Sequence, residues 1–158
     1  MKIYCTLYLW LFFGSYTIYA QCQTWEDIGI IDTWSWASSS SSNYTNIAID
    51  NNGFPIVVYQ DGNQNNKATV KKYNGSNWQF IGNEGFTAGV ASYTNIVLNN
   101  NNTPYISYTD YANGKSISVQ KFDGNSWSVV GTAGFSGGEA YYTDIAIDNY
   151  NTLYVAYM

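Results

Sequence analysis

The chain has 158 residues, of which 46% are hydrophobic, 18% aromatic and only 11% charged. Eleven acidic residues outnumber six lysines, which gives a formal net charge of −5, and the chain contains neither arginine nor histidine. An acidic chain without arginine offers no surface for nucleic acid, and the lack of histidine excludes Ser-His-Asp or Cys-His catalysis and HExxH zinc sites. Disordered chains are poor in aromatic residues, so this composition predicts a packed core.

Residues 1–20 have the pattern of a secretory signal peptide. Lys2 is the only charge before an apolar run over residues 3–13, and the small residue Ala20 ends the segment. The run is shorter than the roughly 20 apolar residues that a membrane span needs. We therefore expect cleavage after Ala20 and a secreted or cell-surface protein that does not span the membrane, the alternative being an uncleaved N-terminal anchor.

A sequence motif recurs with a period of 49 residues. Tyr-Thr-Asn-Ile begins at Tyr44 and Tyr93, and Tyr-Thr-Asp-Ile begins at Tyr142. The register holds without a gap through the matched pairs Pro55 and Pro104, Tyr59 and Tyr108, Asp61 and Asp110, Lys72 and Lys121, and Trp78 and Trp127. A fixed period in this range indicates a repeat architecture.

Each repeat reads as four short strands. In the first unit we expect strands at 44–50, 55–59, 68–73 and 78–81, rich in Val, Ile, Tyr and Trp and separated by turns of Asn, Gly and Asp. Asn74-Gly75 is a hairpin signal, and no window shows a helical period. Four antiparallel strands in about 40–50 residues form one blade of a β-propeller, so the predicted fold is all-β with four-stranded antiparallel blades.

The predicted organisation is an incomplete propeller of about 2.75 blades, fewer than the roughly four to eight that close a ring. Residues 21–43 hold an orphan fourth strand at 24–29 and a Ser-rich link, residues 44–92 form blade 1, residues 93–141 form blade 2, and residues 142–158 form the first half of a truncated blade 3. We therefore expect a fragment of a longer repeat protein, with open blade faces that allow self-association.

The units resemble the kelch-like blades of repeat proteins secreted by bacteria. The shared pattern, Val-x-Lys-aromatic-Asn/Asp-Gly-x-x-Trp, occupies residues 70–78 and 119–127. The diglycine of the second kelch strand is missing, since Gln60-Asp61 and Thr109-Asp110 stand there. The resemblance implies a propeller and names no ligand.

A weaker similarity links the hairpins at residues 73–78 and 122–127 to the fucose-binding six-bladed propeller lectins. That family has an aromatic-Asp-Gly-x-x-Trp hairpin and holds its sugar with an arginine and a glutamate besides aromatic residues. Because this chain has no arginine, the resemblance carries over only to Trp78 and Trp127.

Four residues are candidates for ligand binding. Trp78 and Trp127 could stack on sugar faces, although a tryptophan at the same place in every unit favours a packing role between blades. Asp61 and Asp110 follow the second strand of each unit. They could cap the following turn or act as polar anchors at the mouth of a pocket between blades.

Nothing in the sequence pairs two carboxylates in a recognisable motif, so we expect no catalytic residue and no enzyme activity. We also expect no metal site and no cofactor, because the acidic first turn is not retained: Asp50 becomes Asn99 in the second unit. The predicted function is a secreted, non-catalytic binding or scaffold protein whose partners are glycans or cell-surface proteins. The alternative is a carbohydrate-binding propeller lectin with sugar pockets between blades.

Overall fold

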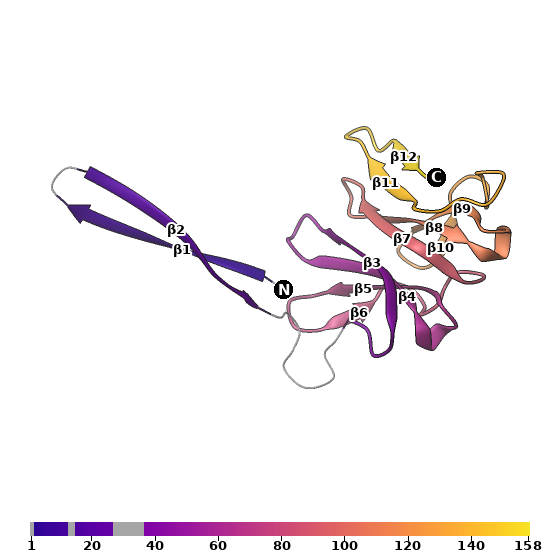
Figure 1. The fold of residues 1–158 in the computed structure, drawn as a ribbon, viewed down its shortest axis with the longest axis horizontal. Coiled ribbons are helices and arrows are strands. Elements are labelled where there is room, and N and C mark those ends of the chain that lie inside the picture. Colours follow the sequence, from indigo (N-terminus) through magenta and orange to yellow (C-terminus); the bar gives the residue numbers. More distant parts are fainter. Residues whose placement is uncertain (1, 13–14, 27–36) are drawn as a thin grey trace.

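The computed structural model describes residues 2–12, 15–26 and 37–158, and within these ranges the chain consists of β-strands and two single-turn 3₁₀ helices (Figure 1). No helix in these ranges is long and apolar enough to cross a membrane.

The first two strands, β1 (Lys2–Phe12) and β2 (Ser15–Glu26), form an antiparallel ribbon that projects away from the other sheets (Figure 1). The proposed leader, residues 1–20, falls on this ribbon and stays a prediction. Residues 24–26 of the predicted orphan fourth strand end β2 and pair with β1, and the rest of that strand lies outside the described residues.

The repeats form two complete four-stranded antiparallel sheets, as the sequence predicts. Blade 1 comprises β3 (Ser42–Ile49), β4 (Pro55–Asp61), β5 (Lys67–Tyr73) and β6 (Trp78–Phe80), and blade 2 comprises β7 (Ala91–Leu98), β8 (Pro104–Asp110), β9 (Ser116–Phe122) and β10 (Trp127–Val129). A third, two-stranded sheet follows with β11 (Asp144–Ile147) and β12 (Leu153–Ala156). In each blade the strands pair in chain order, which is the expected all-β propeller arrangement.

The first turn of each unit is fixed by one side-chain oxygen. Asp50 Oδ1 accepts hydrogen bonds from the amides of Asn52 at 2.9 Å and Phe54 at 2.8 Å. Asn99 and Asp148 make the same pair of bonds in the later units. Because a single oxygen suffices, aspartate and asparagine are interchangeable for this turn.

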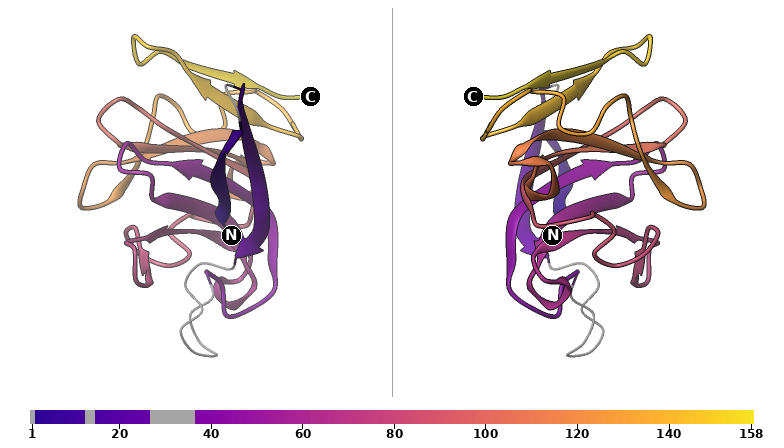
Figure 2. Two further views of the ribbon diagram at one scale, coloured as in Figure 1. Left: turned by 90° about the vertical axis from the view of Figure 1, so that its left-hand side faces the viewer. Right: turned by 90° about the vertical axis from the view of Figure 1, so that its right-hand side faces the viewer.

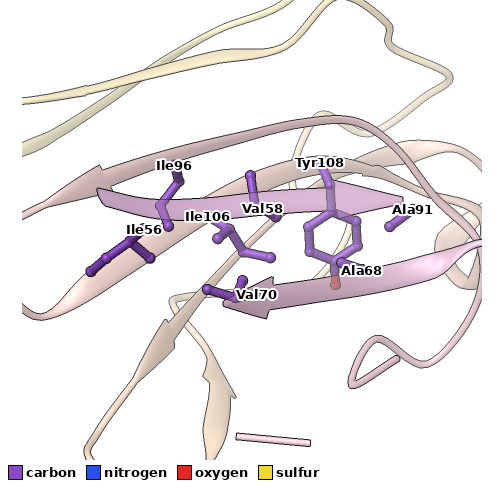
Figure 3. Close-up of a cluster of buried hydrophobic side chains, with 8 residues drawn as sticks. All are labelled: Ile56, Val58, Ala68, Val70, Ala91, Ile96, Ile106 and Tyr108. Carbon is purple, nitrogen blue, oxygen red and sulfur yellow. The ribbon is translucent and has the colours of Figure 1, made fainter. Parts of the chain in front are cut away.

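The core lies between blades 1 and 2, which stack face to face (Figure 2). Figure 3 shows its side chains: Ile56, Val58, Ala68 and Val70 from blade 1, and Ala91, Ile96, Ile106 and Tyr108 from blade 2. A fully buried isoleucine or valine stabilises the folded chain by about 1.5–3 kcal/mol. Each complete blade therefore depends on its neighbour to cover an apolar face.

The three sheets approach one another at their first strands and diverge toward their outer strands. The first strands of neighbouring sheets lie against each other, β3 against β7 and β7 against β11, whereas the outer strands β6 and β10 make no comparable contact between sheets in the described part of the chain. Sheets that meet at their first strands and diverge outward have their propeller axis beside β3, β7 and β11. The axial residues, as we use the term, are those in or just before the first strands at this side: Tyr44, Tyr93, Tyr142, Asn46, Asn95 and Asp144.

Candidate functional site

The two predicted aspartates are buried, and each accepts several hydrogen bonds. Asp61 precedes η1 (Gly62–Gln64) and accepts from the amide of Asn63 and the hydroxyls of Ser40 and Thr69, each at 3.0 Å. Asp61 is 4% exposed. Its oxygens bond to the turn and to the adjoining strand, so Asp61 caps a turn.

Asp110 repeats this role before η2 (Tyr111–Asn113). It accepts hydrogen bonds from the amide of Ala112 at 3.0 Å, from Asn113 Nδ2 at 2.8 Å and from Ser118 Oγ at 2.7 Å. The side chain is buried. Both aspartates thus hold the end of the second strand onto the third.

The predicted tryptophans lie at the opposite end of each blade. Trp127 stacks on Phe86 of the link that leaves blade 1, with ring centroids 4.3 Å apart and an interplanar angle of 9°, and its Nε1 donates to the carbonyl of Ile81 at 2.8 Å. Gly82 admits the indole, since a Cβ there would lie 2.8 Å from Trp127 Cδ1 and its φ is +74°. Trp127 therefore packs one blade onto the next.

Trp78 occupies the matching position in blade 1 and packs on Tyr73, with centroids 5.6 Å apart. In the register of blade 1, Asp61 pairs with Lys67 at the start of β5, and Trp78 pairs with Tyr73 at its end. The aspartates and tryptophans thus occupy opposite ends of their blades and do not converge on one site.

The axial residues include a contiguous arc of three tyrosines. Tyr44 lies 4.6 Å from Tyr93, and Tyr93 lies 4.8 Å from Tyr142, measured between ring centroids. All three have φ near +50°, a left-handed conformation that is rare for a bulky residue and often marks a functional position. Tyr44 and Tyr93 are the third residues of β3 and β7, and a register irregularity accompanies both. Tyr142 lies two residues before β11.

The outer tyrosines of the arc are exposed, Tyr142 at 64%, whereas Tyr93 between them is half-buried. Burial and the neighbouring Tyr142 and Tyr44 side chains raise the pKa of Tyr93 above its usual value. The Tyr93 hydroxyl therefore stays protonated at neutral pH and can both donate and accept a hydrogen bond.

A polar row follows the tyrosines two residues later in each unit: Asn46, Asn95 and Asp144. Asn46 Nδ2 donates to Asn95 Oδ1 at 2.9 Å, and Asn95 Nδ2 donates to the carbonyl of Thr143. Asp144 ends the row as an exposed carboxylate, whose Oδ1 accepts from the amide of Ile145 at 2.9 Å. The axial side of the chain thus combines aromatic surface with one carboxylate.

The sequence contains the signal for this arc, because the same Tyr-Thr-Asn/Asp-Ile motif defines the repeat. In the sequence, the even spacing of this motif indicates only a structural repeat. The fold shows that the three tyrosines lie next to one another at the axis. In the described ranges no three His, Cys, Asp or Glu side chains gather as a metal site would require.

No protein-family model matches the chain. No curated protein matches it either. Among solved structures, the fold is similar to that of a thermostable family-43 glycoside hydrolase, with a TM-score of 0.50 and 14% sequence identity. The similarity covers 73% of this chain and 41% of the hydrolase chain, so the chain spans less than half of its neighbour's length. At this identity the likeness shows the propeller-type fold, and it supports neither the kelch-like nor the lectin resemblance.

The comparison corrects the function predicted from the sequence. The expected non-catalytic binding or scaffold role is contradicted, because a solved structure with a similar fold is a glycoside hydrolase. Secretion is not tested by this comparison and stays a prediction. The expectation of a non-catalytic role rested on the lack of a linear carboxylate motif. In a propeller, the side chains near the axis come from separate blades, so they do not form a continuous sequence motif.

Proposed function

We propose that this chain takes part in the hydrolysis of glycosidic bonds and that its axial residues contact the carbohydrate. The observation that carries the proposal is the arc of Tyr44, Tyr93 and Tyr142 beside the exposed carboxylate of Asp144. The glycoside hydrolase with a similar fold supports it.

Each part of the axial arrangement suits a sugar chain. Aromatic rings offer flat apolar surface for the C–H faces of sugars, and their hydroxyls bond to the polar edges. The arc is held in place by the inner strands, since Thr94 Oγ1 donates to the Tyr44 carbonyl and Asn95 Nδ2 donates to the Tyr93 carbonyl at 3.2 Å. A fixed aromatic surface loses little conformational entropy on binding.

Asp144 is the carboxylate that we assign to the chemistry. Glycosidases use two carboxyl groups about 5–9.5 Å apart, one of which protonates the leaving oxygen. The matching residues Asn46 and Asn95 are amides, so the proposal requires a second carboxyl group at the axis from outside this row.

The test is a reducing-sugar assay of the 158-residue chain on a panel of polysaccharides, combined with affinity electrophoresis on the same panel. Asp144→Asn copies the residue of the other two units, so the fold should persist. We expect it to lower the hydrolysis rate at least about 100-fold while retention in the gel stays unchanged.

Tyr142→Asn tests the arc separately, because asparagine tolerates a positive φ. We expect weaker retention by the polysaccharide, whereas the matched variant Tyr150→Asn, at a side chain 90% exposed on the β11–β12 turn, should bind normally. A wild-type chain that neither cleaves nor binds any polysaccharide would refute the proposal, and so would an Asp144→Asn variant with full activity.

We also propose export, on the basis of Lys2, the apolar run over residues 3–13 and Ala20. Expression in a secreting host followed by N-terminal sequencing tests it. A new N-terminus at Gln21 in the medium supports export, and retention of the intact chain inside the cell contradicts it.

A further inference from the structure

Blade 1 exposes an apolar side chain, Ile47, whose counterparts in the later units are buried. Ile47 is 59% exposed, whereas Ile96 and Ile145, at the same position of the next two units, are 4% and 5% exposed. Ile49 is likewise exposed, and Val57 pairs with Ile47 across β3 and β4. We call Ile47, Ile49 and Val57 the leading face of blade 1.

The other end of the array exposes the opposite face of a sheet. In β11 and β12, Ala146 pairs with Tyr154, and Asp144 pairs with Ala156. All four are exposed while Ile145 between them is buried, and an open hollow of about 170 Å³ lies on these strands. We call Ala146, Tyr154 and Ala156 the trailing face.

These two faces are the halves of an interface that already exists inside the chain. The trailing face of blade 1, formed by Ala48, Ile56 and Val58, packs against Ile96 and Ile106 of blade 2. Residues 49 positions apart correspond, so Ala48 matches Ala146 two units later, and Ile96 matches Ile47 one unit earlier. The exposed leading and trailing faces therefore correspond by position to faces that pack on each other inside the chain, although Tyr154 and Ala156 stand where blade 1 has Ile56 and Val58.

We propose that the leading face of blade 1 in one copy of the chain binds the trailing face of β11 and β12 in a second copy, head to tail. The contact continues the established interface between blades by one step. Figure 2 shows β11 and β12 (yellow) and blade 1 (purple) on opposite sides of the stack, with blade 2 between them.

A polar ladder continues in the same direction. Asn51 Nδ2 donates to the carbonyl of Asn100 at 2.9 Å, and Asn100 Nδ2 donates to the carbonyl of Asn149 at 3.2 Å. The next bond in this series runs from Asn149 Nδ2 to the carbonyl of Asn51 in the second copy. The ladder fixes the register of the contact, which apolar packing alone does not.

The contact is heterologous, since two different faces meet and each copy keeps one face of each kind. Such contacts produce open chains or closed rings and not a symmetric dimer. Because β11 and β12 form a sheet of two strands, the buried area is small, and we expect a dissociation constant of the 158-residue chain in the range of about 1–100 µM.

Sedimentation velocity of the 158-residue chain over a concentration series from about 1 to 200 µM tests the proposal. Ile47→Glu disables the leading face and Ala156→Glu the trailing face, both at side chains exposed within one copy. Tyr150→Glu adds the same charge on the β11–β12 turn, outside both faces, and serves as the matched control. Circular dichroism checks that all variants remain folded.

We expect the wild-type chain and Tyr150→Glu to form species larger than dimers, and each face variant alone to stay monomeric. A mixture of Ile47→Glu and Ala156→Glu should form a 1:1 complex that grows no further, because one intact face of each kind remains. A monomeric wild-type chain over the whole series would overturn the proposal. So would face variants that assemble like the wild type, or a mixture that forms no complex.

Discussion

Among single residues, the buried aspartates at the end of the second strand carry the sharpest prediction. Asp110 accepts hydrogen bonds of 2.7 to 3.0 Å from Ala112, Asn113 and Ser118. Asp110→Ala leaves buried donors without partners, so we expect the free energy of unfolding to fall by about 2–4 kcal/mol. Urea denaturation measures it. The exposed turn aspartate Asp123, changed to Ala, is the control, and an equal loss in both variants would contradict the assigned role.

A second prediction at this scale concerns acid stability. Burial opposes ionisation of Asp50, but the Lys72 ammonium 2.6 Å away and the amides of Phe54 and Asn52 outweigh it and hold the pKa of Asp50 below its usual value. A carboxyl group whose pKa is lower in the folded chain stabilises it above the unfolded pKa of about 4, and this stabilisation is lost as the pH falls through the folded pKa.

We therefore expect Asp50→Asn to destabilise the chain by about 1–2 kcal/mol at pH 7 and to flatten the decline of stability between about pH 5 and pH 2. Asn99 shows that the turn itself accepts asparagine. Urea denaturation at a series of pH values measures both effects. Parallel pH profiles for the two proteins would show that the Lys72 ion pair contributes nothing.

The sequence shows which of these residues are candidates, but it does not show which role each of them has. Asp61 and Asp110 stand out because they recur, and the sequence leaves turn capping and pocket anchoring as alternatives. The structure adds hydrogen bonds from residues distant in the chain, such as Ser40 to Asp61, which no local pattern predicts. The axial position of Tyr44, Tyr93 and Tyr142 likewise depends on how the sheets pack, which no local pattern encodes.

Between elements, the link from one blade to the next depends on Trp127. Its indole rests on Phe86 and bonds to the Ile81 carbonyl, both from the segment that leaves blade 1. We expect Trp127→Ala to lower the free energy of unfolding by about 3–5 kcal/mol, and Trp78→Ala by less than half of that. The reason is that Trp78 packs on Tyr73 within its own blade. Thermal and urea unfolding of both variants measure the difference, and equal losses would argue against a link between blades.

The strands themselves are largely predictable from the sequence. Alternating β-branched and aromatic residues between Asn-, Asp- and Gly-rich turns predict strands over 55–59 and 68–73, and β4 and β5 cover both ranges. The inner strands begin earlier than predicted, β3 at Ser42 and β7 at Ala91, because they pair with the end of the second strand beyond the irregularity at the axial tyrosine. Such an irregularity leaves no mark in the hydrophobic pattern.

For the molecule as a whole, stability should follow position in the array. Blade 2 is covered on both faces, whereas β12 has an exposed face and an unpaired edge within the described chain. In a repeat protein each unit is stabilised by its neighbours, so we expect the amides of β8 and β9 to exchange more slowly with deuterium than those of β12, by at least about tenfold. Hydrogen exchange with mass spectrometry measures the gradient. Uniform protection from β3 to β12 would indicate a single cooperative unit.

The even 49-residue spacing of the Asn51, Asn100 and Asn149 links has a consequence for the gene. A duplication or loss of 49 codons anywhere in the array would join one unit to the next with every turn, link and packing partner in place. Unequal recombination could therefore lengthen or shorten the protein by whole repeat units without passing through a misfolded intermediate. Protein design could lengthen it in the same way, by adding copies of residues 93–141.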